Sequence, residues 1–312
     1  MTNQVLALAG GVGGAKLAFG LTRVLPSEAL TVVVNTGDDE EFYGLHVSPD
    51  LDTVMYTLSE RSNDVTGWGL KDESFRVLQS LGELGADTWF GLGDRDLATH
   101  IRRTQLLREG WTLSDVTAEL CTRYGLDKAI VPMTDARVRT VVRTNEGTMS
   151  FQEYFVKRRC EPVIEELMYD GAEGAAPSQG FADAIEHADA VVFCPSNPFL
   201  SIAPILALDG VRAALASKRP LAVVSPIISG DAVKGPAAKL FQELAKEPAS
   251  SVAVARHYQG LATHFVLDER DAALEPEIRA LGYETSVQQT LMSTPDDKTA
   301  LAKAVCAFLG VA

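Results

Sequence analysis

The stretch LAGGVGGAKLAFGL at residues 8–21 decides the fold of this 312-residue chain. It follows the apolar run VLALA at 5–9 and leads into an apolar segment of helical period, a pattern typical of a buried strand that turns directly into a helix. Glycines at such a turn let an anion approach the unpaired N–H groups of the helix start. We therefore predict a phosphate cradle made by Gly10, Gly11, Gly13, Gly14 and Lys16.

The glycine spacing matches neither GxGxxG nor GxxxxGK[ST], the two familiar phosphate-binding fingerprints. A tight strand-to-helix turn with a solvated Lys16 is therefore the structural alternative.

Four further apolar runs indicate where the chain continues this strand-and-helix alternation. They are rich in Val, Ile and Leu and are separated by longer amphipathic stretches, as expected for buried parallel strands joined by helices. The runs are LTVVVN at 30–35, ADAVVFC at 188–194, PLAVVSP at 220–226 and THFVLD at 263–268. The sequence predicts a Rossmann-like, doubly wound α/β fold with a mainly parallel sheet.

The chain between the second and third runs has a different pattern. Residues 70–84 and 96–124 are predicted to be helical, and residues 138–170 alternate like strands around a turn at 145–147. We expect one Rossmann-like domain over residues 1–312, with an inserted helical and β-hairpin subdomain at about 60–178.

Composition excludes several classes of protein. The 28 basic and 42 acidic residues give a formal charge of −14, which offers no general attraction for nucleic acid or an anionic membrane. The four cysteines form no CxxC pair, so neither a zinc knuckle nor a disulfide framework is indicated. Without a secretory signal or a long apolar span, the chain is expected to be cytoplasmic.

Polar and acidic residues follow the second predicted strand in NTGDDEEFYGLHVSPDLDTVMYTL, residues 35–58. Because ligands of open α/β sheets bind at the carboxyl ends of strands, Asn35 and Thr36 are expected beside the glycine loop. Asp38 and Asp50 are candidate ligands for Mg²⁺, which takes carboxylate and phosphate oxygens. The alternative is that Asp50 or Asp52 only caps the following helix.

A second dense cluster lies in WFGLGDRDLATHIRRTQLL, residues 89–107. Arg95 can make a two-pronged contact to a phosphate or carboxylate group, and the aromatic pair Trp89 and Phe90 can stack on a flat ring. A surface network of ion pairs is the alternative. The candidate site residues in this block are Trp89, Asp94, Arg95, His100 and Arg103. Ser196 and Asn197, which follow the third run, complete the set at the strand ends.

Several of these segments together resemble the 2-phospho-L-lactate transferase family of coenzyme F420 biosynthesis. The resemblance extends from about residue 4 to about 305, in order and without a large gap. It is carried by GGVGGAKL, NTGDDEEFYGLHVSPDLDTVMYTL, GWGLKDES, WFGLGDRDLATHIRRTQLL, PMTDARVRT, FQEYFV, PSNPFLSIAPIL and SPIISGDAVKGPAAKL.

The resemblance implies a homodimer that moves a phosphate-linked three-carbon acid from a guanosine diphosphate conjugate to the deazaflavin Fo. GMP would be released and Mg²⁺ would assist, held by Asp38 and Asp50. The acid carried is left open among lactate, enolpyruvate and glycerate. Two alternatives are a nucleotide-binding regulator of the related gluconeogenesis-factor group, without turnover, and an NAD-dependent oxidoreductase.

The resemblance also implies roles for individual residues. Asp50 lies near the acceptor, and Asp50 or Asp94 takes the proton of the attacking hydroxyl. The glycine loop with Ser196 and Asn197 holds the guanosine phosphates and base. Fo is expected among residues 89–100 and the inserted subdomain.

Overall fold

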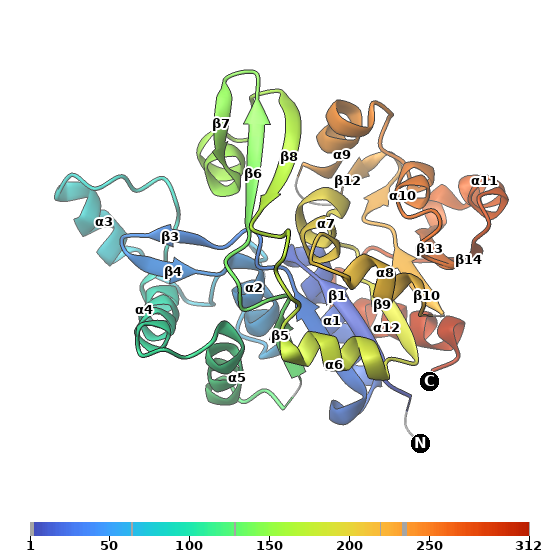
Figure 1. Ribbon diagram of the computed structural model, residues 1–312, viewed down its shortest axis with the longest axis horizontal. Coiled ribbons are helices and arrows are strands. Elements are labelled where there is room, and N and C mark those ends of the chain that lie inside the picture. The colour runs from blue at the N-terminus through green and yellow to red at the C-terminus, as the bar shows by residue number, and fades with distance from the viewer. Residues whose placement is uncertain (1–2, 64, 128, 219, 233–235, 312) are drawn as a thin grey trace.

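The computed structural model describes residues 3–63, 65–127, 129–218, 220–232 and 236–311, so residues 233–235 of the last quoted motif lie outside it. Its centre is a parallel sheet of seven strands in the order β14-β13-β10-β9-β1-β2-β5 (Figure 1). The strands are β1 (Val5–Ala9), β2 (Leu30–Val34), β5 (Ala129–Pro132), β9 (Ala190–Phe193), β10 (Leu221–Val224), β13 (His264–Asp268) and β14 (Glu284–Gln288).

Both faces of the sheet are covered, which explains why its strands are continuously apolar. Alternate residues of β1 are buried in two hydrophobic cores on opposite faces of the sheet. Leu6 and Leu8 lie in one core, and Ala7 lies in the other. The helices α1 (Gly11–Val24), α2 (Pro49–Leu58) and α12 (Pro295–Leu309) bury residues in the core of Ala7. The opposite core receives residues of α6 (Gln179–His187), α8 (Val211–Ala216) and α10 (Ser251–His257). The predicted doubly wound fold is confirmed.

The chain between β2 and β9 differs from the predicted single insertion at about 60–178. It passes through α3 (Arg76–Glu83), α4 (Asp94–Arg108) and α5 (Leu113–Arg123) and then returns to the central sheet as β5. Ile130 of β5 and Leu120 of α5 are buried in the same core as α1. The prediction missed this strand, because its apolar run AIVP is interrupted by a proline, a residue that is more typical of turns and strand edges.

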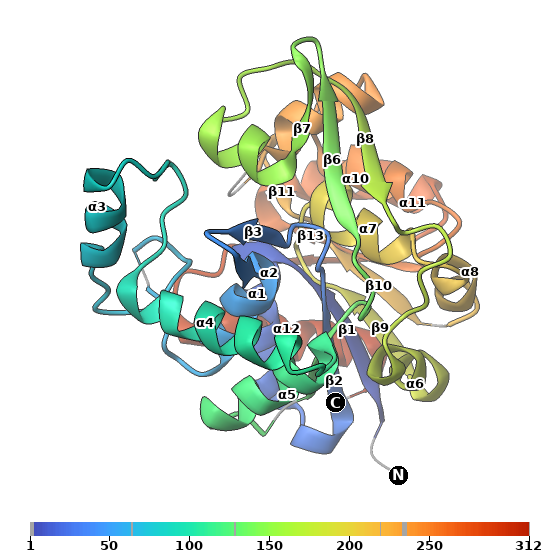
Figure 2. The same cartoon turned by 60° about the vertical axis from the view of Figure 1, so that its left-hand side comes forward.

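The predicted hairpin at 138–170 is present and carries a third strand. β6 (Arg139–Thr144) pairs antiparallel with β7 (Gly147–Ser150) and with β8 (Ile164–Asp170). Figure 2 shows this small sheet standing above the central one, while α3 projects from the body of the molecule. A second hairpin, β3 (Glu40–Phe42) and β4 (Leu45–Val47), follows β2.

The remaining elements are short. They are η1 (Ser27–Ala29), η2 (Glu153–Lys157), η3 (Pro198–Ile202), α7 (Ala203–Leu206), β11 (Ile227–Ile228), β12 (Asp231–Ala232), α9 (Ala237–Leu240), η4 (Phe241–Ala245), η5 (Glu269–Leu274) and α11 (Glu275–Ala280). No helix among the described residues has both the length and the apolar character needed to cross a membrane.

The strand order reverses direction at β1, which lies between β2 on one side and β9 on the other. The loops that leave β1 and β9 therefore diverge from neighbouring strands at the carboxyl edge of the sheet, where open α/β sheets form ligand crevices. This switch point locates the candidate site.

Candidate active site

A cavity of about 610 Å³ opens at this switch point. It is lined by the turn after β1, the loop after β9, the start of α2, one face of α4, and aromatic residues from residues 66–91 and 151–156. Of the predicted site residues, the structure brings to the cavity wall Gly10, Gly11, Gly13, Lys16, Asp38, Asp50, His100, Ser196 and Asn197. A cavity of this size accommodates a nucleotide-sized ligand.

The glycine turn presents fewer free N–H groups than its sequence suggests. Helix α1 begins at Gly11, and Gly10 donates its N–H to Ser196 Oγ at 3.1 Å. Gly11 donates to Asp50 Oδ1 at 2.7 Å. The orphan donors left at the helix start are those of Val12 and Gly13, both on the cavity wall. An anion would therefore be met by these two groups and by the positive end of the helix.

The glycines are also required by the protein itself. A Cβ at Gly13 would overlap the carbonyl oxygen of Pro195, and one at Gly14 would overlap Ser196 Oγ. Gly11 adopts a left-handed φ of 62°, which favours glycine. Much of the glycine pattern thus reflects close packing of the β1 turn against the β9 loop, and Gly14 does not reach the cavity wall.

Asp50 is buried at the second position of α2, where it caps a different helix from the one predicted. Its Oδ1 accepts the first N–H of α1, and its Oδ2 accepts Asn35 Nδ2 at 3.0 Å. Burial raises the pKa of Asp50 to about 6, although the hydrogen bonds from Asn35 and Gly11 oppose the shift. Asn35 therefore lies behind Asp50 as a support and does not itself line the cavity.

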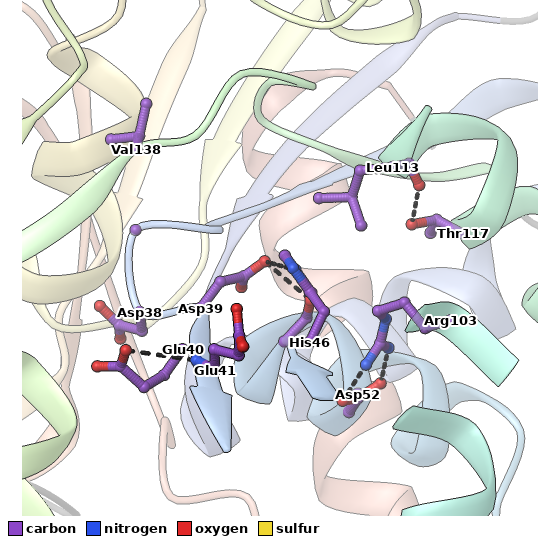
Figure 3. A network of polar contacts seen from close by, with 12 residues as sticks. Asp38, Asp39, Glu40, Glu41, His46, Asp52, Arg103, Leu113, Thr117 and Val138 are labelled. Carbon is purple, nitrogen blue, oxygen red and sulfur yellow. Dashed lines mark hydrogen bonds and ion pairs between the residues drawn. The ribbon is translucent and has the colours of Figure 1, made fainter. Parts of the chain in front are cut away.

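Asp38 is another buried acid on the cavity wall, and its Oδ1 has no hydrogen-bond partner among the residues that the structure describes. Burial and the nearby charge of Asp50 raise its pKa well above the usual value. Asp39 points the other way, toward His46 Nε2 and Ser48 Oγ, each 2.8 Å away (Figure 3). Asp38 and Asp50 thus form an acid pair with an unsatisfied oxygen, as the donor set of a divalent cation requires.

A polar network closes the cavity on the α4 side. Arg103, 1% exposed, makes a two-pronged ion pair with Asp52 (Figure 3). Its Nη1 also lies 3.2 Å from His100 Nδ1. Tyr56 donates its hydroxyl to Asp96 Oδ1 at 2.6 Å. Asp52 belongs to this network, so it does not act as the simple helix cap of the alternative reading.

Two residues predicted to bind the ligand serve packing or local structure. Trp89 meets Phe42 edge-on with ring centres 5.3 Å apart, and Arg95 Nη1 donates to Lys71 O at 2.6 Å. Neither lines the cavity, nor do Thr36 and the guanidinium of Arg103.

The structure gives Asp94, the predicted alternative catalytic base, a structural role that does not support that prediction. This residue is half-buried and lies outside the cavity wall. Its oxygens accept Ser74 Oγ at 2.5 Å and the N–H groups of Arg76 and Val77, the first residues of α3. These bonds lower its pKa, the largest effect coming from Ser74. Asp94 therefore caps α3.

Aromatic lining residues were mostly missed from the sequence. Trp68, Phe151 and Phe155 come from separate segments and join Phe90 on the cavity wall. Phe151 and Phe155 stack with ring centres 5.3 Å apart, and Trp68 is 47% exposed at the mouth. Only Phe90 stood in a block whose spacing suggested a site. The only sequence signal for Trp68 was the motif GWGLKDES, and the only one for Phe151 and Phe155 was FQEYFV.

Lys16 and Asn197, two further residues of the cavity wall, form hydrogen bonds with backbone groups. Lys16 Nζ donates to Met292 O at 2.7 Å, which ties α1 to the segment after β14. Asn197 Oδ1 accepts the N–H groups of Phe199 and Leu200 and so caps η3. Asn197 consequently keeps its amide Nδ2 as the group available to a ligand.

A parallel sheet with a helix terminus, paired acids and a cavity at its switch point is typical of Rossmann-like α/β proteins that bind phosphorylated ligands. The model of one family, described as 2-phospho-L-lactate transferase CofD, matches residues 5–307. The chain belongs to this family, and it is accordingly a transferase.

Similar proteins carry two different names. A phosphoenolpyruvate transferase of Streptomyces griseus is 43% identical over 96% of both chains. A 2-phospho-L-lactate transferase of Methanosarcina acetivorans is 41% identical over 96% of this chain and 97% of its own. Among solved structures, a UPF0052-family protein of Bacillus halodurans covers 98% of this chain and 99% of its own with a TM-score of 0.64. At 14% identity that likeness shows the fold alone.

Proposed function

We propose that this chain transfers a phospho-three-carbon-acid unit from a guanosine diphosphate conjugate to the 5′-hydroxyl of the deazaflavin Fo, with release of GMP. The acid pair of Asp38 and Asp50 beside the start of α1 carries the proposal. An anion at Val12 and Gly13 would lie close to two carboxylates and be repelled by them. A cation between acids and phosphate removes this conflict, and Mg²⁺ is the usual one.

Asp38 and Asp50 are therefore the proposed Mg²⁺ ligands. The orphaned Oδ1 of Asp38 and the raised pKa values of both acids fit such a role, because a bound cation stabilises the ionised forms. When bound, Mg²⁺ supplies charge neutralisation at the phosphates between which the bond breaks.

The reaction makes a bond from the Fo hydroxyl oxygen to the phosphorus that bears the acid, and it breaks the bond from that phosphorus to the GMP phosphate. The hydroxyl proton must leave during attack. Asp50 is the proposed base, because it lines the cavity beside the start of α1 and a carboxylate that is ionised there can accept the hydroxyl proton. Asp94, at the start of α4, lies outside the cavity wall, and its oxygens accept the first N–H groups of α3, so it is not proposed to share this role.

The cavity walls fit the two proposed substrates separately. The guanosine phosphates would take the N–H groups of Val12 and Gly13, with Ser196 and Asn197 alongside. The planar ring system of Fo would lie against the aromatic wall that includes Trp68 and Phe155. Membership of the family also supports a homodimer, which light scattering of the purified protein tests.

The identity of the three-carbon acid stays open, because relatives at nearly equal identity are named for phosphoenolpyruvate and for 2-phospho-L-lactate. The test incubates the protein with Fo, Mg²⁺ and each guanosine-diphosphate-linked acid in turn, followed by mass spectrometry. We expect one conjugate to be consumed with equal amounts of GMP and the Fo adduct. Binding of GDP without consumption of Fo from any conjugate would favour the nucleotide-binding regulator instead.

A further inference from the structure

His100 lies on the cavity wall, 1% exposed, on the inner face of α4. Its ring is held between groups from two helices. Arg103 Nη1 is 3.2 Å from Nδ1, and the nearest oxygens are Asp52 Oδ2 at 3.6 Å from Nδ1 and Asp96 Oδ2 at 3.4 Å from Nε2. These contacts determine which ring nitrogen carries the proton.

A guanidinium donates hydrogen bonds and accepts none. Since Arg103 Nη1 is within hydrogen-bond distance of His100 Nδ1, that nitrogen must offer its lone pair. Asp52 Oδ2 does not compete for a proton on Nδ1, because it lies beyond hydrogen-bond distance and already accepts Arg103 Nη1 at 3.0 Å. The ring proton is consequently on Nε2.

The Nε2 donor is buried and has no hydrogen-bond partner in the described part of the chain. Asp96 Oδ2 is close but outside the hydrogen-bond geometry, and Asp96 Oδ1 is taken by the Tyr56 hydroxyl. Buried N–H groups in native proteins are nearly always satisfied. An unsatisfied donor on the wall of a binding cavity therefore points to an acceptor atom supplied by the ligand.

We propose that Arg103 is a positioning residue that, anchored by Asp52, fixes His100 as the Nε2–H tautomer, so that His100 donates a hydrogen bond to a ring oxygen or nitrogen of the acceptor substrate. The identity of that substrate as Fo rests on the proposed function. The tautomer itself does not, because it follows from contacts within the protein.

A metal ion is the competing explanation, since Asp52, Asp96 and His100 can bring three ligand atoms within 4.8 Å of one another. Arg103 argues against it. Its guanidinium contacts both Asp52 and the Nδ1 of His100, so the positive charge that a cation would bring is already present there.

The first experiment uses the full-length protein without ligand, with ¹³C- and ¹⁵N-labelled histidine, and assigns the His100 ring by its loss in His100→Gln. We expect ring resonances of the neutral Nε2–H form at pH 7.5. The Nδ1–H form or an imidazolium would overturn the proposal. Zn²⁺ is then added as a probe, and direct shifts of both ring nitrogens would show a metal site in its place.

The second experiment measures steady-state kinetics with Fo for paired variants. Glutamine places an amide N–H near the position of Nε2, so His100→Gln should keep KM for Fo within about threefold. His100→Phe should raise it about tenfold, as expected for one lost hydrogen bond. Equal KM values for the two variants would overturn the donor role.

Arg103→Lys tests the positioning role, because one ammonium cannot hold both Asp52 and the histidine ring. We expect a mixture of His100 tautomers and a KM for Fo raised about tenfold, with kcat changed less. Arg102→Lys, at an exposed neighbour that contacts Gln105, is the matched control and should change neither. An Arg103→Lys protein with the wild-type tautomer would contradict the proposal whatever its activity.

Discussion

At the scale of single residues, the acid pair of Asp38 and Asp50 is costly to the fold. Both are buried, and burial is the largest cause of their raised pKa values. The hydrogen bonds that Asn35 and Gly11 donate to Asp50 offset only part of the free energy lost when its carboxylate is removed from water. Two buried acids that lower the stability of the fold are expected to serve ligand binding. Replacing one of them should therefore reduce activity without reducing stability.

Asp50→Asn should lower turnover of Fo by roughly 100-fold or more, because it removes a proposed metal ligand and base. The melting temperature at pH 7.5 should change little, because the removal of one buried charge offsets the loss of the hydrogen bond from Asn35, while the new amide oxygen still accepts the Gly11 N–H. Asp39→Asn is the matched control, because Asp39 faces His46 and Ser48, and should stay within about threefold of wild-type turnover. Wild-type turnover by Asp50→Asn would disprove our assignment.

Magnesium affinity should weaken as the pH falls through about 6, because the proton and the metal compete for Asp50. At pH 5 the competition from this one group should raise the apparent Kd about tenfold over its value at pH 7.5. Isothermal titration with MgCl₂ at the two pH values measures this. An affinity that is flat over this range would mean that neither acid binds the metal.

The same raised pKa has a consequence for stability without metal. Asp50 binds its proton more tightly in the folded than in the unfolded chain, so its contribution to stability is fully present below pH 3.8 and is lost as the pH rises to about 6.

At the scale of elements, the turn after β1 and the loop after β9 act as one unit. Gly13 packs on the Pro195 carbonyl, and Gly10 donates to Ser196. The helix start is thereby aimed at the cavity by the neighbouring loop, since the four-glycine sequence alone cannot fix its direction.

Gly13→Ala should accordingly destabilise the protein even without nucleotide, because its Cβ would overlap a backbone oxygen that cannot move freely. Overpacking of this kind costs roughly 1–3 kcal/mol. Gly82→Ala in α3 is the control, since its Cβ would make ordinary contacts with Thr88 and alanine favours helix. Urea denaturation compares the two variants. An unchanged midpoint for Gly13→Ala would show that the glycine serves the ligand alone.

Helix α3 offers a test of the corrected role of Asp94. Asp94→Ala should speed amide hydrogen exchange in α3, whose first N–H groups it accepts, while turnover stays within about threefold of wild type. A loss of turnover of 100-fold with unchanged exchange in α3 would restore the catalytic role.

At the scale of the whole molecule, the periodic apolar runs were sufficient to predict the doubly wound, mainly parallel sheet. Five of its strands stood out as such runs, whereas β5 and β14 did not, because the apolar run of Ala129–Pro132 ends in a proline and Glu284–Gln288 is too polar. Asp38 and Asp50 could be proposed from their place after β2. The structural roles of Asp94 and Trp89 could not, because a motif records which residues are near in sequence and not which way they face.

Ligand binding should stabilise the whole chain by mass action. GDP with Mg²⁺ at one hundred times its Kd should add about 2.7 kcal/mol to the free energy of unfolding, visible as a higher melting temperature. In Asp38→Asn, the additional stabilisation caused by Mg²⁺ should disappear, whereas the stabilisation caused by GDP alone should remain. Equal Mg²⁺ increments in both proteins would place the metal elsewhere.

The order of the strands also bears on how the chain is made. β1 is synthesised well before β9, with which it pairs over a separation of 185 residues (Val5 with Ala190), and Gly20 of α1 packs on Lys298 of α12. A nascent chain that ends before residue 190 leaves one edge of β1 open and leaves α1 without its α12 neighbour. Prematurely terminated products should therefore aggregate and be degraded rapidly. A chain divided at residue 178 should yield two fragments that fold only when they are expressed together.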